Sequence, residues 1–347
     1  MRVVFRVDAS LEMGIGHVMR CLTLAQTLKE NGACVKFICR KHDGNLIDKI
    51  QSCGFNVYGL ELFEDYEKVR KLAHSHWLGA TQQQDANDCI EVLKGMNINW
   101  LIVDHYALDV NWHRRLRSIV DKIMVIDDIA DRQFDCDILL NQNLGTKKED
   151  YNDKVSDNCE LLQGVKYALL RPEFSNLREK ALIKRKNTKE INNILISMGG
   201  SDVKNITFEI LQKIDSCFNI VVVLGKKSPN NQILKNYIKN KKNITIFIDS
   251  SNMAELMLNA DLSIGAGGST SWERCSLALP TLLFVTADNQ KEVANNLEKL
   301  GAVKTVKYFN KDLQTLTNNI CNWQLMSEES SKVCDGAGVS RVIGYIQ

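Results

Sequence analysis

The sequence predicts an α/β protein of two domains, each built around a parallel β-sheet. Short runs of β-branched and apolar residues alternate with longer stretches of helical periodicity, which is the pattern of successive strand-helix units. This pattern occurs twice, and 347 residues exceed what one ordinary α/β core needs. A lysine-rich polar run at residues 184–190 lies between the two series.

The two series predict the strands in order. In the first half they lie near residues 2–7, 34–39, 55–58, 100–103, 123–126 and 138–140, and in the second near residues 191–198, 219–224, 244–248, 261–264, 281–285 and 303–306.

These strands predict two Rossmann-like domains, an N-terminal one over residues 1–175 and a C-terminal one over residues 190–347. The polar stretch that begins at Arg171 and Pro172 is typical of a linker. We expect the final segment, from about Ser327, to pack back on the first domain. Ligands of such sheets bind at the carboxyl ends of the strands, so we expect a central cleft there.

Composition excludes several classes of protein. The formal net charge is +2, with 44 basic and 42 acidic residues, which disfavours nucleic acid as a partner. No run of about 18 apolar residues occurs, so we expect neither a membrane span nor membrane binding. The 11 cysteines form no C-x-x-C pair, which favours reduced thiols and a cytoplasmic location.

The first candidate site is the segment Asp8–Cys21, which leaves the first strand, crosses a glycine turn and enters a helix. Gly14 and Gly16 would let the backbone approach a ligand closely, and the helix start offers free N–H groups to an anion. The third glycine of the dinucleotide-binding fingerprint is missing. The turn therefore predicts a ligand site of another kind.

A histidine stands at the start of this helix. The electropositive helix N-terminus disfavours an imidazolium, so His17 is a candidate general base. Arg20 shares its helix face and could contact the same substrate, and Asp8 could orient the imidazole. A histidine packed at a turn is the structural alternative.

The second candidate site follows the strand near residues 100–103. Asp104, His105 and Tyr106 are candidates to hold a sugar or position water, and Asp104 could equally cap the loop. Asp127 and Asp128 repeat the arrangement after the next strand.

Adjacent carboxylates can bind Mg²⁺. A loop cap or an ion pair with Arg132 is the favoured explanation for Asp127 and Asp128.

The third candidate site is the turn Gly267–Thr270, between an apolar strand and a helix. Its backbone N–H groups and hydroxyls predict a diphosphate cradle, and Glu273 in the first helical turn could accept hydrogen bonds from a ribose. Helix capping alone would explain Ser269 and Thr270, but not the paired glycines together with Asn289 and Gln290 after the next strand. The lysine of a Walker A loop is absent.

A similar loop, Met198–Asp202, follows the first strand of the second half. A Gly199-Gly200 turn would let the backbone meet a phosphate or sugar. A plain turn capped by Ser201 or Asp202 explains it equally well.

Together these motifs resemble the nucleotide-sugar glycosyltransferases of the GT-B fold. Residues 246–290 are similar to the uridine-diphosphate site of the transferase that makes lipid II. The N-terminal motifs and residues 170–174 and 199–202 resemble the UDP-sugar hydrolase family of pseudaminic acid biosynthesis. The resemblance runs from residue 1 to about residue 300, and the chain is longer than the compact members, near residues 68–84 and at its C-terminus.

The resemblance implies hydrolysis of UDP-2,4-diacetamido-2,4,6-trideoxy-β-L-altropyranose to release UDP, without a metal or another cofactor. It implies that His17 activates the water. The resemblance implies a role in substrate binding for Tyr106, Arg171 and Asn205, which join Asp8, Gly14, Gly16 and Arg20 of the glycine turn as expected substrate-binding residues. The nucleotide-binding residues are Gly200, Ile248, Gly268, Ser269, Thr270, Glu273, Asn289 and Gln290. We expect a monomer whose only partners are the UDP-sugar substrate and the UDP product.

Two other classes share the UDP site. A glycosyltransferase would need a groove for an acceptor, often with a membrane-facing patch. A nucleotide-sugar binding protein would have no use for a base at His17.

Overall fold

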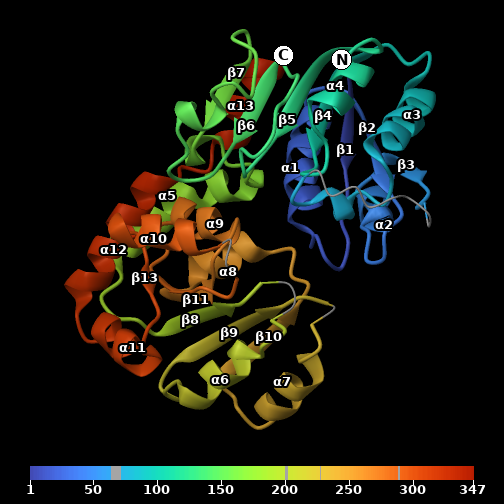
Figure 1. Ribbon diagram of the computed structural model, residues 1–347. Coiled ribbons are helices and arrows are strands. Elements are labelled where there is room, and N and C mark those ends of the chain that lie inside the picture. Colours follow the sequence, from blue (N-terminus) through green and yellow to red (C-terminus); the bar gives the residue numbers. More distant parts are fainter. Residues whose placement is uncertain (64–71, 200–201, 227, 288–289) are drawn as a thin grey trace. The chain divides into compact units, whose positions relative to one another are not determined.

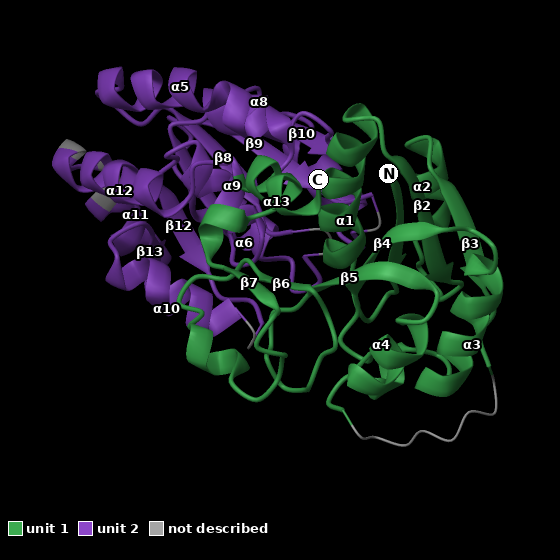
Figure 2. Cartoon of the chain, turned by 90° about the horizontal axis from the view of Figure 1, so that it is seen from above, with its two compact units in different colours: residues 1–169, 338–347 green, residues 170–337 purple. Residues whose placement is uncertain are grey.

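The computed structural model describes residues 1–63, 72–199, 202–226, 228–287 and 290–347 (Figure 1). The chain divides into two compact units (Figure 2). Unit 1 comprises Met1–Leu169 and Gly338–Gln347, and unit 2 comprises Leu170–Ala337. Each unit contains one sheet whose neighbouring strands are parallel, as the alternating pattern predicts.

The sheet of unit 1 has seven strands in the order β3-β2-β1-β4-β5-β6-β7. Their bounds are β1 Arg2–Val7, β2 Cys34–Arg40, β3 Asn56–Leu60, β4 Ile98–Asp104, β5 Val120–Ile126, β6 Ile138–Asn141 and β7 Glu160–Gln163. The sequence predicts the first six and misses β7. β1 pairs with β2 on one side and with β4 on the other, so the strand order reverses its direction at β1. Open α/β sheets bind ligands at such a switch point.

Helices cover both faces of this sheet. Their bounds are α1 Gly16–Glu30, α2 Ile47–Ser52, α3 Gln82–Leu93, α4 Val110–Leu116 and α13 Gly338–Ile346, with 3₁₀ helices η1 Ser75–Trp77, η2 Lys148–Tyr151 and η3 Val165–Tyr167. Val3 and Phe5 of β1 are buried in the cluster with α1 and α13, while Val4 is buried in the cluster with α3 and α4. Alternate residues of one strand thus serve two helical layers, which explains its continuous apolar run.

The last helix belongs to unit 1. Nε1 of Trp100 donates a hydrogen bond to the Ile346 carbonyl at 2.9 Å. A Cβ at Gly338 would lie 2.2 Å from the Ala168 carbonyl oxygen, so only glycine fits at the start of α13. α12, Ile320–Val333, which contains Ser327, lies in unit 2, and the chain returns to unit 1 only at Gly338.

The sheet of unit 2 has six strands in the order β10-β9-β8-β11-β12-β13. The strands are β8 Asn193–Ser197, β9 Asn219–Leu224, β10 Ile244–Ile248, β11 Leu262–Ala266, β12 Thr281–Phe284 and β13 Lys304–Thr305. The helices are α5 Pro172–Asn187, α6 Ile206–Lys213, α7 Asn231–Ile238, α8 Met253–Asn259, α9 Thr270–Ser276, α10 Lys291–Lys299, α11 Phe309–Thr317 and α12. All six predicted strands of the second half are present.

The stretch expected to be a linker forms the helix α5 instead. Pro172 occupies its first turn, where the missing N–H costs nothing. Phe174, Ala181 and Arg185 are buried, and Arg185 donates hydrogen bonds to the carbonyls of Met257 and Ala260 at 2.8 and 2.5 Å. These three residues are seven and four positions apart, so one face of an otherwise polar helix is anchored in unit 2.

Along the parts of the chain that the structure describes, no helix has the length and apolar character needed to cross a bilayer.

Candidate functional site

The turn between β1 and α1 is open at both of its glycines. Gly14 has a φ of 76° and donates its N–H to the Ser10 carbonyl at 2.9 Å, so a residue without a Cβ is favoured there. Gly16 opens α1, and no described atom lies within 4 Å of the place a Cβ would take at either glycine. Packing does not require glycine at position 16, which leaves room for a ligand at the start of α1.

His17 is held by a carboxylate from the neighbouring strand. Its Nδ1 lies 2.6 Å from Oδ1 of Asp104, the last residue of β4. Because an ionised carboxylate only accepts, Nδ1 carries the proton and Nε2 presents its lone pair. No described residue hydrogen bonds to that Nε2. The pair has the geometry of a histidine base with an orienting acid.

Arg20 completes this arrangement one turn along α1. Its Nε and Nη2 donate to both oxygens of Asp104 at 2.6 and 2.7 Å. Burial alone would raise the pKa of Asp104, but Arg20 and His17 hold that pKa well below its usual range. Asp104 therefore stays ionised and keeps the His17 ring in one orientation.

Asp8, expected to orient His17, does not contact it. Asp8 is buried and accepts from Nη1 of Arg6 and from the backbone N–H of Arg40, both at 2.6 Å. His105 also turns inward, with Nε2 3.2 Å from Asp8, and burial lowers the pKa of this histidine. The expectation that Asp8 orients His17 is wrong, because the Asp8 carboxylate pairs with the buried Arg6 and Asp104 contacts His17 instead. The expectation that His105 contacts a ligand is wrong because its side chain is buried against Asp8.

Tyr106 and Asp128 border the same site. The hydroxyl of Tyr106 donates to Asp128, which also accepts from Nη1 of Arg20 at 2.6 Å and from Nδ2 of Asn143 at 3.0 Å. The three side chains stand two residues after the ends of neighbouring strands: Tyr106 after β4, Asp128 after β5 and Asn143 after β6. Because parallel strands end at one edge, side chains far apart in sequence meet here.

Asp127 has a structural role, as its ion-pair explanation predicts. It accepts from Nη1 of Arg132 at 2.9 Å, from the Tyr151 hydroxyl at 2.8 Å and from the backbone N–H of Ala130 at 2.7 Å. Within the described ranges, no three His, Cys, Asp or Glu side chains are grouped as metal ligands would be.

The segment of η1 brings additional aromatic rings to His17. The centroid of Trp77 lies 6.3 Å from that of His17 and 5.8 Å from that of Tyr106, and His74 lies 4.4 Å from Trp77. These residues belong to the stretch near residues 68–84 that the sequence shows only as an addition. Three aromatic or imidazole side chains within four positions, residues 74–77, are the only signal that could have drawn attention to it.

In unit 2, the turn Gly267–Thr270 connects β11 to α9. Gly268 has a φ of 124°, which favours glycine, and a Cβ at Gly267 would lie 3.1 Å from Cβ of Gln290. Ser269 occupies the N-cap position, but its side chain accepts no capping hydrogen bond. Capping therefore does not account for this hydroxyl.

A buried arginine supports the turn from below. Arg274 donates from Nη2 to the Ala266 carbonyl at 2.7 Å and to the Ser271 hydroxyl at 3.1 Å. Burial lowers its pKa to about 10, so the guanidinium is charged at neutral pH. A Cβ at Gly265 would lie 2.1 Å from its Nη1 and 2.8 Å from the Ser197 carbonyl oxygen, and because that backbone oxygen cannot move aside easily, glycine is required there.

Glu273 and Arg171 lie together in unit 2. Nη2 of Arg171 is 4.0 Å from Oε1 of Glu273, and Nη1 of Arg171 binds the Ser251 carbonyl at 3.0 Å and Glu173 at 3.1 Å. Burial raises the pKa of Glu273 to about 7, although Arg171 acts in the opposite direction. A carboxyl whose pKa is raised in this way to near neutral pH is typical of a functional site.

Of the remaining predicted nucleotide residues, Gly200 and Asn289 lie outside the described residues. Oε1 of Gln290 accepts from the backbone N–H and hydroxyl of Thr286 at 2.9 and 3.1 Å, which fixes the amide beside Gly267. Ile248 ends β10 and is half-buried.

Asp202, in the loop before α6, caps the start of that helix. Its carboxylate accepts from the N–H groups of Ile206 and Thr207 at 2.9 and 3.0 Å. The capping explanation of this loop is thus confirmed. Asn205 stands just before α6 with a φ of 55°, and its Oδ1 is buried without a partner among the described residues.

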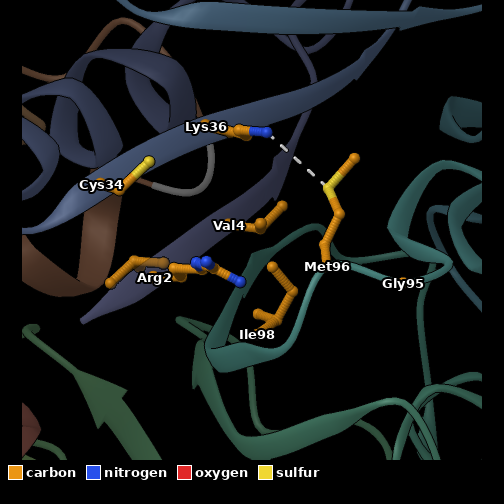
Figure 3. A pocket seen from close by; sticks show the side chains of 8 residues that line it. Arg2, Val4, Cys34, Lys36, Gly95, Met96 and Ile98 are labelled. Carbon is orange, nitrogen blue, oxygen red and sulfur yellow. Dashed lines mark hydrogen bonds between the residues drawn. The ribbon is translucent and has the colours of Figure 1, made fainter.

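A pocket in unit 1 lies at the amino ends of the strands, opposite the carboxyl ends near His17 (Figure 3). It is lined by Arg2 and Val4 at the start of β1, Cys34 and Lys36 of β2, and Ile98 of β4, and Lys36 contacts Met96 there. These residues lie at the amino ends of the strands, whereas open parallel sheets bind ligands at the carboxyl ends. The candidate site is therefore the cluster around His17.

The fold and one domain match establish the class of this protein. A model described as the glycosyltransferase family 28 C-terminal domain matches residues 177–335. The crystal structure of MurG from Acinetobacter baumannii superposes with a TM-score of 0.67 and 16% identity, over 100% of this chain and 99% of that one. The predicted GT-B fold is confirmed, and the chain is a nucleotide-sugar enzyme related to glycosyltransferase family 28.

Two relatives of similar sequence indicate the family to which the chain belongs. A UDP-2,4-diacetamido-2,4,6-trideoxy-β-L-altropyranose hydrolase of Campylobacter jejuni is 30% identical over 309 residues, 89% of this chain and 100% of that protein. An uncharacterized protein of Methanocaldococcus jannaschii is 31% identical over 303 residues, 84% of this chain and 57% of that protein. The chain belongs to the same family as the Campylobacter protein.

Proposed function

We propose that this protein hydrolyses UDP-2,4-diacetamido-2,4,6-trideoxy-β-L-altropyranose, a step of pseudaminic acid biosynthesis, and releases UDP. The observation that carries the proposal is the His17 imidazole, whose Nδ1 is bound by Asp104 and whose Nε2 has no partner among the described residues. Support also comes from the 30% identity to the Campylobacter hydrolase over its full length.

In the proposed reaction, water attacks the anomeric carbon of the sugar. Nε2 of His17 takes a proton from that water, a new C–O bond forms, and the bond from the carbon to the β-phosphate oxygen breaks as UDP leaves. Asp104 stabilises the imidazolium that results, and Arg20 keeps Asp104 ionised. His17 returns the proton to solvent at the end of the cycle.

We assign the nucleotide to unit 2. The turn Gly267–Thr270 would offer N–H groups and hydroxyls to the diphosphate, and Glu273 would accept hydrogen bonds from the ribose. Arg171, next to Glu273, would bind a phosphate or sugar oxygen. Fixed donors and a cation can stabilise the departing UDP, so the proposal uses no metal or other cofactor.

The test is incubation of the purified protein with this nucleotide sugar in ¹⁸O-labelled water, without any acceptor. We expect stoichiometric UDP and free sugar, with the label in the sugar, because attack occurs at carbon. Label in UDP would show attack at phosphorus and would overturn the role given to His17. Absence of UDP release would overturn the hydrolase proposal itself.

A UDP-sugar glycosyltransferase is the second candidate. Leu11 and Ile15, on the turn before α1, are 75% and 49% exposed, and an apolar acceptor could contact them. A transferase would release UDP only when an acceptor is added, whereas the hydrolase turns over in plain water. A nucleotide-sugar binding protein would retain the ligand intact under both conditions.

A further inference from the structure

Trp77 differs from every other tryptophan in the chain. The sequence contains five, and Trp100, Trp112, Trp272 and Trp323 are each at most 4% exposed, whereas Trp77 is only half-buried. A large aromatic side chain exposed beside polar groups is typical of a ligand-binding surface.

The ring of Trp77 belongs to an aromatic cluster that borders the proposed base. Its plane is within 25° of that of Tyr106, and it meets the His17 ring at 73°. Tyr106 in turn meets His17 edge to face with centroids 4.7 Å apart. The cluster therefore forms an apolar wall next to the groups that would act on the anomeric carbon.

The backbone holds this wall in place. The N–H of Trp77 donates to the His74 carbonyl at 3.0 Å, and the Ser75 hydroxyl donates to the Leu72 carbonyl at 2.8 Å. Leu78, which follows, is buried in the core with α3 and α4.

The segment is also tied to the glycine turn, because Nε2 of His76 lies 2.8 Å from a carboxylate oxygen of Glu12. An aromatic side chain fixed in this way loses little freedom when a ligand packs on it.

We infer that Trp77 is a specificity-determining residue whose indole packs against the apolar C–H face and methyl groups of the bound sugar. The inference rests on the proposed function, which places the anomeric carbon near Nε2 of His17. Arg20 and Asp128 would bind the polar groups of the sugar, since both lie in the same cluster. Trp77 thus recognises a sugar with methyl or acetamido substituents rather than the nucleotide.

Collisional quenching of tryptophan fluorescence by acrylamide tests this inference in the His17→Asn background, in which the nucleotide sugar should bind without being consumed. Free protein should show one accessible tryptophan that disappears in the Trp77→Phe variant. UDP-2,4-diacetamido-2,4,6-trideoxy-β-L-altropyranose should protect this tryptophan at least about fivefold more than UDP does at equal occupancy. Equal protection by the two ligands, or none by either, would overturn the inference.

Kinetics give an independent readout. Trp77→Ala should raise KM about tenfold with kcat within about threefold, Trp77→Phe should restore most of the affinity, and inhibition by UDP should be unchanged. Tyr308→Ala, at an aromatic residue 71% exposed in unit 2, is the matched control and should change neither constant. Unchanged KM in Trp77→Ala, with active wild type, would refute the role of Trp77 alone. An inactive wild type in which the nucleotide sugar still protects Trp77 would refute the hydrolase proposal and keep the sugar contact.

Discussion

Replacing Glu273 with Gln should stabilise the protein and weaken UDP binding. Burial raises the pKa of the Glu273 carboxyl from 4.5 to about 7. A rise of this size corresponds to about 3 kcal/mol, the cost of keeping the carboxylate ionised in the folded protein. The ionised carboxylate that would bind the ribose therefore lowers the free energy of unfolding.

The sign of the pH dependence follows from the raised pKa. Below pH 4.5 the carboxyl is protonated in both the folded and the unfolded chain, so Glu273→Gln should change the free energy of unfolding little there. As the pH rises from 4.5 to 7, only the unfolded chain ionises readily, and the wild type loses stability that the variant keeps. The gain in the variant should reach its maximum, at most about 3 kcal/mol, above pH 7.

Two measurements decide the outcome. Urea unfolding of wild type and Glu273→Gln between pH 4.5 and 8 gives the stability difference, and calorimetry at pH 8 gives UDP affinity, which should fall about 10- to 100-fold because a charge-assisted hydrogen bond is lost. Glu173→Gln is the matched control, since Glu173 also contacts Arg171 but is 41% exposed. That variant should change stability by less than about 0.5 kcal/mol. A Glu273→Gln protein less stable than wild type at pH 8 would contradict the raised pKa of Glu273, and unchanged UDP affinity would contradict its contact with the ribose.

Three further predictions follow from the site. Asp104→Asn should lower kcat roughly 10- to 1,000-fold with a smaller change in KM, because His17 loses its orienting charge; equal kcat in steady-state assays would contradict this. Gly265→Ala should destabilise unit 2 by about 2 kcal/mol or more, seen as an earlier urea transition, because its Cβ would clash with Arg274 and with the Ser197 carbonyl oxygen; an unchanged midpoint would contradict this. EDTA should leave UDP release unaltered, and loss of turnover that Mg²⁺ restores would return Asp127 and Asp128 to the metal hypothesis.

Much of the fold is predictable from the sequence because its strands are long and apolar on both faces, as β1 shows with Val3, Val4 and Phe5. β7, Glu160–Gln163, is missed because it has four residues and polar ends. α5 resembles a linker because only Phe174, Ala181 and Arg185 of its 16 residues are buried. A short strand with polar ends and a polar helix carry little periodic signal, so tertiary packing decides them.

The candidate site divides in the same way. His17, Arg20 and Tyr106 are recognisable from the glycine turn and the polar end of a strand. The partner of His17 is not, since Asp8 and Asp104 both follow apolar strands and only the side-chain packing distinguishes them. Trp77 stands in a polar stretch without periodicity, and its contact with Tyr106 joins residues from separate elements.

The comparison of binding and turnover in His17→Asn tests directly whether His17 is the base. Asparagine keeps polarity and approximate size but cannot accept the proton from water, so affinity for the nucleotide sugar should stay within about threefold while single-turnover UDP release falls roughly 10²- to 10⁴-fold. Circular dichroism and UDP affinity equal to the wild type would show that the variant is folded. A folded His17→Asn protein that releases UDP at the wild-type rate would show that His17 is not the base.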